Sequence, residues 1–343
     1  MTKRALVTGV TGQDGAYLCK RLIERGYEVH GAYRRSASSD FWRLDYLGIA
    51  DQVKRVPFDL LEPSNILRAI DKVRPDEIYN LAAQSFVALS FEQPIYTTDA
   101  DALGPLRILE AIRTVDPSIR FYQASTSEMF GKVQETPQKE STPFYPRSPY
   151  GVAKLYAHWI TVNYRESYNL HATSGILFNH ESPLRGTEFV TRKITSHLAL
   201  IKHGRTAPLE LGNLDAHRDW GFAGDYVEGM IQMVQADQAD DFVLSTGEMH
   251  TVREFVNRAA EVAGFRLHWE GEGASEFAKD DDGKTIVQIK SEFYRPAEVD
   301  TLLGDSTKAR TQLGWKPTTT FQELVEMMMT ADLDRAARGI LRV

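Results

Sequence analysis

The chain of 343 residues contains a single cysteine, Cys19. An intrachain disulfide is therefore excluded, and this composition is typical of a reducing cytoplasm, where we expect the protein to reside. Cys19 falls beside Leu18 and Leu22 in an expected helix, which favours packing in a core over nucleophilic chemistry.

Long apolar runs and excess positive charge are also missing. No stretch approaches the roughly 20 apolar residues of a membrane span, and MTKRALVTG reaches glycine before the apolar core of a signal peptide could form. The formal net charge of -7 argues against nucleic acid or an anionic membrane as partner. An anionic ligand would need local Arg and Lys. No spacing of His, Cys and Asp suggests a metal.

Short apolar runs alternate with helical patterns in the first half of the chain, which predicts successive βα units and a parallel sheet. We expect strands at 5–7, 28–33, 55–58, 77–81 and 120–124, and helices at 16–25, 64–72 and 104–114. From about residue 176, long polar loops predict a smaller lobe. The expected fold class is therefore α/β: a Rossmann-type, doubly wound parallel sheet with a smaller, mixed α/β substrate-binding lobe.

Three glycines follow the first expected strand and open the first helix. Gly9, Gly12 and Gly15 have the spacing G-x-x-G-x-x-G, which lets a backbone turn tightly and bring a pyrophosphate to a helix N-terminus. A glycine-rich turn without a ligand is the alternative. Arg34 and Arg35 stand after the second strand, where NAD-binding sheets carry an acidic residue, so NADP is the expected cofactor. An exposed basic turn would also explain them.

Two further strand ends suit the same cofactor. Asp59, after the third strand, could accept a hydrogen bond from the adenine amino group while Leu60 packs on the ring. The sequence NLAAQS at 80–85 ends the fourth strand, and its small side chains would let the cofactor lie close.

A tyrosine and a lysine stand one helical turn apart in SPYGVAKLYAH. Lys154, with a bound nicotinamide cation, would lower the pKa of Tyr150 from about 10 toward neutrality, so that the phenolate could take a proton from a substrate hydroxyl. The preceding strand ends in ASTSEMF. Thr126 there could cap a helix, and Glu128 could be either part of that cap or a catalytic acid or base.

At this point the residues resemble a known family. GVTGQDGAYL, YNLAAQSFV, QASTSEMFG, PRSPYGVAK, ILFNHESPLRG, RDWGFAGDYV and RPAEVD are similar to motifs of the GDP-mannose 4,6-dehydratases, which are extended short-chain dehydrogenase/reductases. The resemblance runs from about residue 4 to residue 330.

The resemblance implies a three-stage reaction on GDP-mannose with NADP as cofactor. Hydride leaves carbon 4, water is lost across carbons 5 and 6, and the hydride returns to carbon 6. It implies a catalytic set of Thr126, Glu128, Tyr150 and Lys154, with Glu128 deprotonating carbon 5. It also implies a homodimer or homotetramer. The loop SASSDFWRL of this chain departs from the serine-rich pattern that the family usually has there.

The resemblance also implies the binding residues. The cofactor set is Gly9, Thr11, Gly12, Gln13, Asp14, Gly15, Arg34, Arg35, Asp59, Leu60, Leu81, Ala82, Ala83, Gln84, Ser85, Tyr96, Lys154, His180 and Arg185. The substrate set is Ser85, Glu128, Asn179, Val190, Lys193, Arg218, Arg295 and Glu298. We expect an NADP-binding domain from 1–178 with 219–247, and a nucleotide-sugar-binding domain from 179–218 with 248–343.

Three alternatives stay open on the sequence alone. An epimerase or reductase of the same fold would leave Glu128 idle, and a dehydratase of another GDP-sugar, such as a GDP-heptose, would share the chemistry. A redox sensor or scaffold would need neither Tyr150 nor Lys154. His180 could equally be a capped loop histidine.

Overall fold

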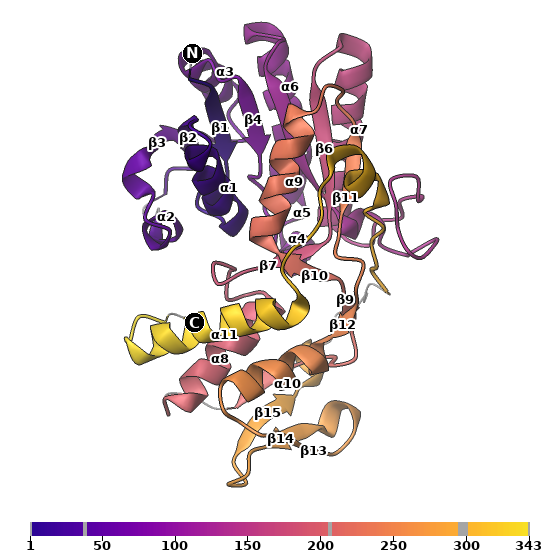
Figure 1. Ribbon diagram of the computed structural model, residues 1–343. Helices are drawn as coiled ribbons and strands as arrows, with labels where there is room; N and C mark the ends of the chain where they lie inside the picture. Colours follow the sequence, from indigo (N-terminus) through magenta and orange to yellow (C-terminus); the bar gives the residue numbers. More distant parts are fainter. Residues whose placement is uncertain (1, 37–39, 205–207, 294–300, 342–343) are drawn as a thin grey trace.

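The computed structural model describes residues 2–36, 40–204, 208–293 and 301–341 (Figure 1). Among them a seven-stranded parallel sheet runs in the order β11-β6-β5-β4-β1-β2-β3. Its strands are β1 (Arg4–Thr8), β2 (Glu28–Tyr33), β3 (Val53–Pro57), β4 (Glu77–Asn80), β5 (Arg120–Thr126), β6 (Ala172–Leu177) and β11 (Asp241–Leu244). The five strands expected from the sequence are present, and the doubly wound fold class is confirmed.

Helices cover both faces of this sheet because its strands are apolar on both sides. In β1, Ala5 and Val7 belong to one hydrophobic core and Leu6 to the other, as successive side chains of a strand point to opposite faces. The first face carries α1 (Gln13–Glu24) and α9 (Ala223–Gln235), and the second carries α3 (Pro63–Val73), α6 (Gly104–Val115) and α7 (Pro149–Tyr168).

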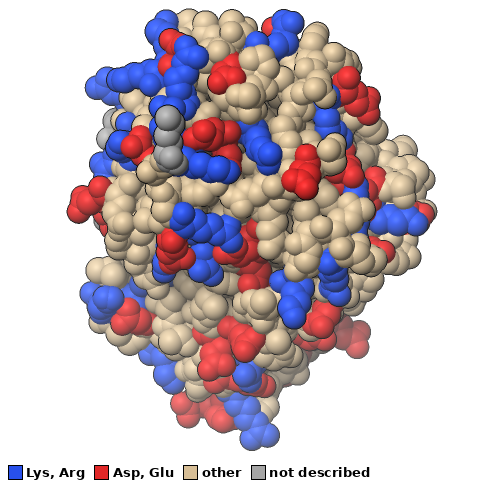
Figure 2. Space-filling model, turned by 45° about the horizontal axis from the view of Figure 1, so that its top comes forward, with Lys and Arg blue, Asp and Glu red and all other residues tan. Residues whose placement is uncertain are grey.

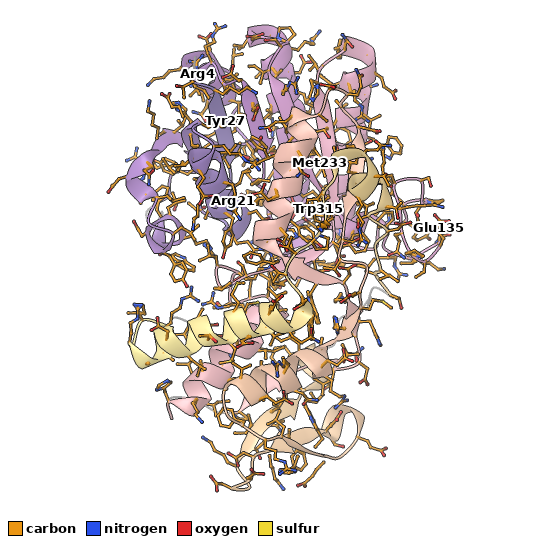
Figure 3. All side chains as sticks on the ribbon, in the orientation of Figure 1. Arg4, Arg21, Tyr27, Glu135, Met233 and Trp315 are labelled. Atoms are coloured by element: carbon orange, nitrogen blue, oxygen red, sulfur yellow. The ribbon has the colours of Figure 1, made fainter. Side chains whose placement is uncertain are left out.

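Further short helices lie in this first part of the chain. They are α2 (Trp42–Tyr46), η1 (Ala50–Gln52), α4 (Val87–Glu92), α5 (Pro94–Thr98), η2 (Asp99–Leu103) and η3 (Ser127–Met129). Cys19 is fully buried on α1, which confirms its packing role. Trp315 joins the same core as Met233 of α9 (Figure 3), and its Nε1 donates to Asp225 O at 2.8 Å.

A second, smaller sheet lies beyond the carboxyl ends of the central strands (Figure 1). It runs β13-β14-β15-β8, with β8 (Leu209–Leu211), β13 (His268–Glu270), β14 (Phe277–Lys279) and β15 (Thr285–Ile289). The helices α8 (Val190–Lys202), α10 (Val252–Val262) and α11 (Phe321–Ala337) share its hydrophobic core. Short helices η4 (Gly273–Ser275) and η5 (Ser291–Phe293) lie in this half of the chain, whereas η6 (Ala309–Leu313) packs in the same core as α1 and α9.

Two short strand pairs stand between the two sheets. They are β7 (Asn179–Glu181) with β10 (Trp220–Phe222), and β9 (His217–Arg218) with β12 (His250–Thr251). Capping boxes begin α10 at Thr251 and α11 at Thr320, each closed by a glutamate three residues on.

The order of the central strands locates the expected ligand site. The chain runs from β1 outward to β3 and then returns to place β4 on the other side of β1. Ligands of such sheets bind outside the carboxyl ends of the strands at this reversal. Here the Thr8 hydroxyl donates to Asn80 Oδ1 at 2.8 Å and accepts the N–H groups of Leu81 and Ala82, each at 3.0 Å.

The surface carries mixed charge. On the face that Figure 2 shows, Lys and Arg are interspersed with Asp and Glu. In the described residues no helix is both long and apolar enough to span a membrane.

Candidate functional site

The glycine loop between β1 and α1 makes close backbone contacts. Gly9 has a φ of +69°, and a Cβ there would lie 2.9 Å from backbone atoms of Leu81 and Ala82. A Cβ at Gly15 would collide with Gly9 O. Gly12 precedes α1 and supplies no side-chain cap, so the first amides of the helix are left for an anion. This cradle fits the pyrophosphate of a dinucleotide.

A cavity of about 570 Å³ opens at the carboxyl ends of β1 and β4 and extends toward the second sheet. It brings together most of the residues predicted from the sequence. Those that line it are Gly9, Gly12, Gln13, Asp14, Gly15, Leu81, Ala83, Ser85, Thr126, Glu128, Tyr150, Lys154, Asn179, His180, Arg185, Val190, Lys193 and Arg218. Arg295 and Glu298 fall outside the described residues.

The four predicted catalytic residues come from three elements, β5, η3 and α7. Thr126 ends β5 and Glu128 lies in η3, while Tyr150 and Lys154 lie on the first turns of α7. Lys154 Nζ stands 5.8 Å from the centre of the Tyr150 ring and donates to Ala124 O at 3.1 Å. The tyrosine, the lysine and the carboxylate therefore line one cavity.

Local sequence explains why these elements meet. Ser148 caps α7 by accepting the N–H of Gly151 at 3.0 Å, and Pro149 takes the first helical position. A Cβ at Gly151 would lie 2.9 Å from Glu128 O, so glycine lets η3 approach the helix. Thr126 also caps η3, because its hydroxyl accepts the N–H of Glu128 at 3.2 Å. The two interpretations of ASTSEMF are thus compatible.

The predicted lowering of the Tyr150 pKa is not found in the protein alone. Burial raises the pKa of this phenol above its ordinary value, and the carboxylate of Asp101 adds to the rise, while the hydrogen bond with Thr126 opposes it. Burial also lowers the pKa of Lys154, against the opposing charge of Asp101. Ionisation of Tyr150 near neutral pH therefore requires a further positive charge, which a bound oxidised nicotinamide would bring.

Asp101 is a buried carboxylate acting electrostatically on Lys154, and sequence reasoning missed it. It is 1% exposed in the π-helical turn η2, its Oδ1 accepts the N–H of Gln84 at 2.7 Å, and its Oδ2 is buried without a hydrogen-bond partner among the described residues. Burial raises its pKa to about 6, against the charge of Lys154. A carboxylate flanked by two alanines in DADALG was the available signal.

His180 and Asp14 form an ion pair behind the glycine loop. His180 Nδ1 lies 2.8 Å from Phe178 O and Nε2 lies 2.9 Å from Asp14 Oδ2. Both partners are acceptors, so both ring nitrogens carry protons. Although burial acts to lower it, the Asp14 carboxylate raises the pKa of His180. The ring also stacks on Tyr226 with centroids 4.7 Å apart. This arrangement places a cation beside the helix N-terminus.

The residues predicted for the adenosine end of the cofactor do not line the cavity; they are Arg34, Arg35, Asp59, Leu60 and Tyr96. Arg34 Nη1 donates to the Tyr96 hydroxyl at 2.6 Å, which joins two residues predicted separately. Arg35 is exposed next to it. Asp59 Oδ1 accepts the N–H of Leu61 at 3.0 Å, and Leu60 is buried.

Three further predicted cofactor residues hold the loops in place. Thr11 O accepts a hydrogen bond from Arg43 at 2.8 Å, and the N–H of Ala82 is taken by Thr8. The side-chain amide of Gln84 donates to Phe86 O at 3.1 Å. Backbone and amide groups of these residues therefore position the loops.

The far end of the cavity carries cations. Lys193 Nζ stands 3.8 Å from the centre of the Phe293 ring, and burial lowers the pKa of Lys193. Arg218 comes from β9, which pairs with β12. Phe293 and Asn213 also line the cavity and were not expected from the sequence. In the described part of the chain no group of three or more His, Cys, Asp or Glu could hold a metal.

The fold and this constellation define the class of protein. A seven-stranded doubly wound sheet, a glycine loop at its strand reversal and a Tyr-x-x-x-Lys pair beside it are the features of an extended short-chain dehydrogenase/reductase. A solved structure of Thermus thermophilus UDP-glucose 4-epimerase in complex with NAD is 26% identical and superposes with a TM-score of 0.79, covering 96% of this chain and 98% of that one.

Sequence comparison identifies the family more closely. Residues 6–328 match the family model described as GDP-mannose 4,6 dehydratase, and the chain belongs to this family. A GDP-mannose 4,6-dehydratase of Vibrio cholerae is 52% identical over 99% of this chain and 96% of its own length. The human GDP-mannose 4,6 dehydratase is 52% identical over 96% of this chain and 91% of its own length.

Proposed function

We propose that this protein is an NADP-dependent hydro-lyase that converts GDP-mannose to GDP-4-dehydro-6-deoxymannose and water, the first step toward GDP-deoxyhexoses. One observation carries the proposal: Glu128 lines the same cavity as Tyr150 and Lys154. Hydride transfer at carbon 4 needs the tyrosine and lysine, whereas loss of water needs an additional base. A nucleotide-sugar epimerase or reductase would have no use for that carboxylate.

The residues divide the chemistry between them. Tyr150 takes the proton of the carbon 4 hydroxyl, and Lys154 and Thr126 stabilise the phenolate. A bound dinucleotide would supply the acceptor for the hydride of carbon 4 and the donor of the same hydride to carbon 6. The ketone formed at carbon 4 acidifies carbon 5, whose proton Glu128 removes. The carbon 6 hydroxyl leaves with a proton as water, and a proton returns to carbon 5, so the net change is the loss of one water.

NADP is the proposed cofactor rather than NAD. Arg34 and Arg35 follow β2, where an acidic residue would otherwise hold the ribose hydroxyls. The Tyr96 hydroxyl orients the Arg34 guanidinium. Two guanidinium groups suit an additional phosphate, which both can bind with several N–H donors.

The GDP moiety is proposed to bind at the far end of the cavity. Lys193 and Arg218 supply cationic groups there for a diphosphate, with Asn179 and Val190 beside them. We extend this set to Arg295 and Glu298 on the family motif alone. We accordingly propose two domains. The NADP-binding domain is made of 1–178 with 219–247, and the nucleotide-sugar-binding domain of 179–218 with 248–343.

We also propose that the protein is a homodimer or homotetramer in the cytoplasm. Val152, Tyr156 and Trp159 are 56%, 40% and 55% exposed and share one face of α7, and Ile95 of the neighbouring α5 is 83% exposed. A two-fold contact would bury this face.

Trp159→Glu should shift the mass measured by light scattering toward the monomer. A wild-type monomer would contradict the assembly, and activity found in a membrane or periplasmic fraction would contradict the location.

The proposed function has a direct test. Purified protein with GDP-mannose and a catalytic amount of NADP+ should yield a GDP-4-keto-6-deoxyhexose, detected by mass spectrometry, without net build-up of NADPH. NAD+ in place of NADP+ should support the conversion poorly. Stoichiometric NADPH, or an epimer that keeps its 6-hydroxyl, would overturn the assignment. A panel with other GDP-sugars, including a GDP-heptose, decides between hexose and heptose.

A further inference from the structure

Arg43 of α2 connects two loops that approach the cavity from different parts of the chain. Its Nη1 donates to Thr11 O at 2.8 Å, within the glycine loop between Gly9 and Gly12. Its Nε donates to Leu184 O at 2.6 Å, in the loop that follows β7. One guanidinium therefore fixes the distance between the two loops, and because the group is planar it also fixes their relative orientation.

The loop after β7 is gripped a second time from the opposite side. Arg192 of α8 donates through Nη1 to Pro183 O at 3.0 Å and to Arg185 O at 2.9 Å. Arg192 Nε in turn pairs with Asp332 Oδ2 at 2.7 Å, and Arg335 Nη1 pairs with Asp332 Oδ1 at 2.8 Å, both within the buried core side of α11. The backbone around Arg185 is thereby attached to α8 and, through Asp332, to α11.

The same network returns to α2. The Arg335 guanidinium stands 4.7 Å from the centre of the Tyr46 ring and 5.5 Å from that of Trp42. Arg43 lies 4.6 Å from the same Trp42 ring, and burial, with the nearby Arg192 charge, lowers its pKa to about 10. The contacts thus form a closed circuit through α2, the loop at 183–185, α8 and α11.

We propose that Arg43 is a positioning residue that couples binding of NADP to binding of the nucleotide sugar, an inference that rests on the proposed function. Arg43 follows the segment that begins with Arg34 and Arg35, and it holds the loop around the dinucleotide pyrophosphate. Its second contact, at Leu184 O, holds the loop between β7 and α8, the two elements that carry Asn179, Val190 and Lys193 of the proposed GDP site. One side chain contacts both loops, so the ligand that binds first orders both of them. The second ligand then binds more tightly, because less conformational entropy is lost when it binds.

The coupling can be measured without turnover by calorimetry with NADP+ and GDP. In the wild type, saturating NADP+ should tighten GDP binding by at least about fivefold, and GDP should tighten NADP+ binding by the same factor. Arg43→Gln should bring this factor close to one. Arg43→Lys keeps the charge and can reach one carbonyl at a time, so it should retain an intermediate factor. Arg165→Gln is the matched control.

Arg165 serves as control because it is also a partly buried arginine bound to a backbone carbonyl, Ala172 O at 2.9 Å, but its hydrogen bonds go to Ala172 and Asp241 and to neither of the two loops. Its substitution should lower the melting temperature and leave the coupling factor unchanged. If the wild type binds neither NADP+ nor GDP, the proposed function fails. If it binds both but without coupling, or if Arg43→Gln keeps the full factor, this inference is overturned. If Arg43→Gln does not fold, the lysine variant decides. A coupling factor in Arg43→Lys equal to that of the wild type would overturn this inference.

Discussion

Glu128→Gln is expected to reduce overall conversion of GDP-mannose by about 10²- to 10⁴-fold, the usual contribution of a positioned acid or base. The carboxylate lies half-buried in η3 and lines the cavity, and the amide keeps its shape while losing its basicity. Oxidation at carbon 4 should persist, since Tyr150 and Lys154 are untouched. A single-turnover experiment should therefore show a reduced cofactor that is formed but not reoxidised.

The isotope pattern separates the two roles that a carboxylate could have. In deuterated water the wild-type product should carry deuterium at carbon 5, and bound substrate in Glu128→Gln should exchange that hydrogen far more slowly. Glu166→Gln, an exposed substitution on α7, controls for loss of charge. A glutamine variant that eliminates water at the wild-type rate would show that another group acts at carbon 5. Fast exchange at carbon 5 with slow elimination would instead assign Glu128 to protonating the leaving hydroxyl.

The meeting of the glycine loop with the Tyr150 and Lys154 pair could be predicted because these residues stand in short, contiguous motifs. Gly9, Gly12 and Gly15 are fixed by one strand-to-helix turn, and Tyr150 and Lys154 by one turn of α7. Each arrangement depends on local geometry, which residue spacing reveals directly. Switch-point topology then brings such motifs together at one edge of the sheet, whatever their separation along the chain.

Other features depend on contacts between distant segments, which spacing does not reveal. Asp101 stands in a π-helical turn before α6, and that irregularity leaves no periodic signature in the sequence. Arg43 gains its role from carbonyl oxygens that lie 32 and 141 positions away. The pKa of Tyr150 could not be judged from its helical neighbour alone, because burial and the Asp101 carboxylate raise it.

Tyr150→Phe is expected to lower kcat/KM by about 10²- to 10⁴-fold, because the ring keeps its packing but can no longer accept the carbon 4 hydroxyl proton. The pH dependence gives the sharper test. The acting form is the phenolate, whose pKa is raised in the free protein, so wild-type kcat/KM for NADP+, which reports the cofactor-free protein, should increase with pH below that raised pKa.

Positive charge from the bound oxidised cofactor favours the phenolate, so the rise in kcat should occur at lower pH than the rise in kcat/KM. Both rises should be absent from the residual activity of Tyr150→Phe. Tyr156→Phe, two turns from the start of the same helix and 40% exposed, should behave like the wild type. A phenylalanine variant with the wild-type pH profile would mean that another group takes the proton. Lys154 and Asp101 face the phenol from α7 and η2. The difference in pH between the rise in kcat and the rise in kcat/KM therefore measures how far the cofactor charge offsets the burial of Tyr150.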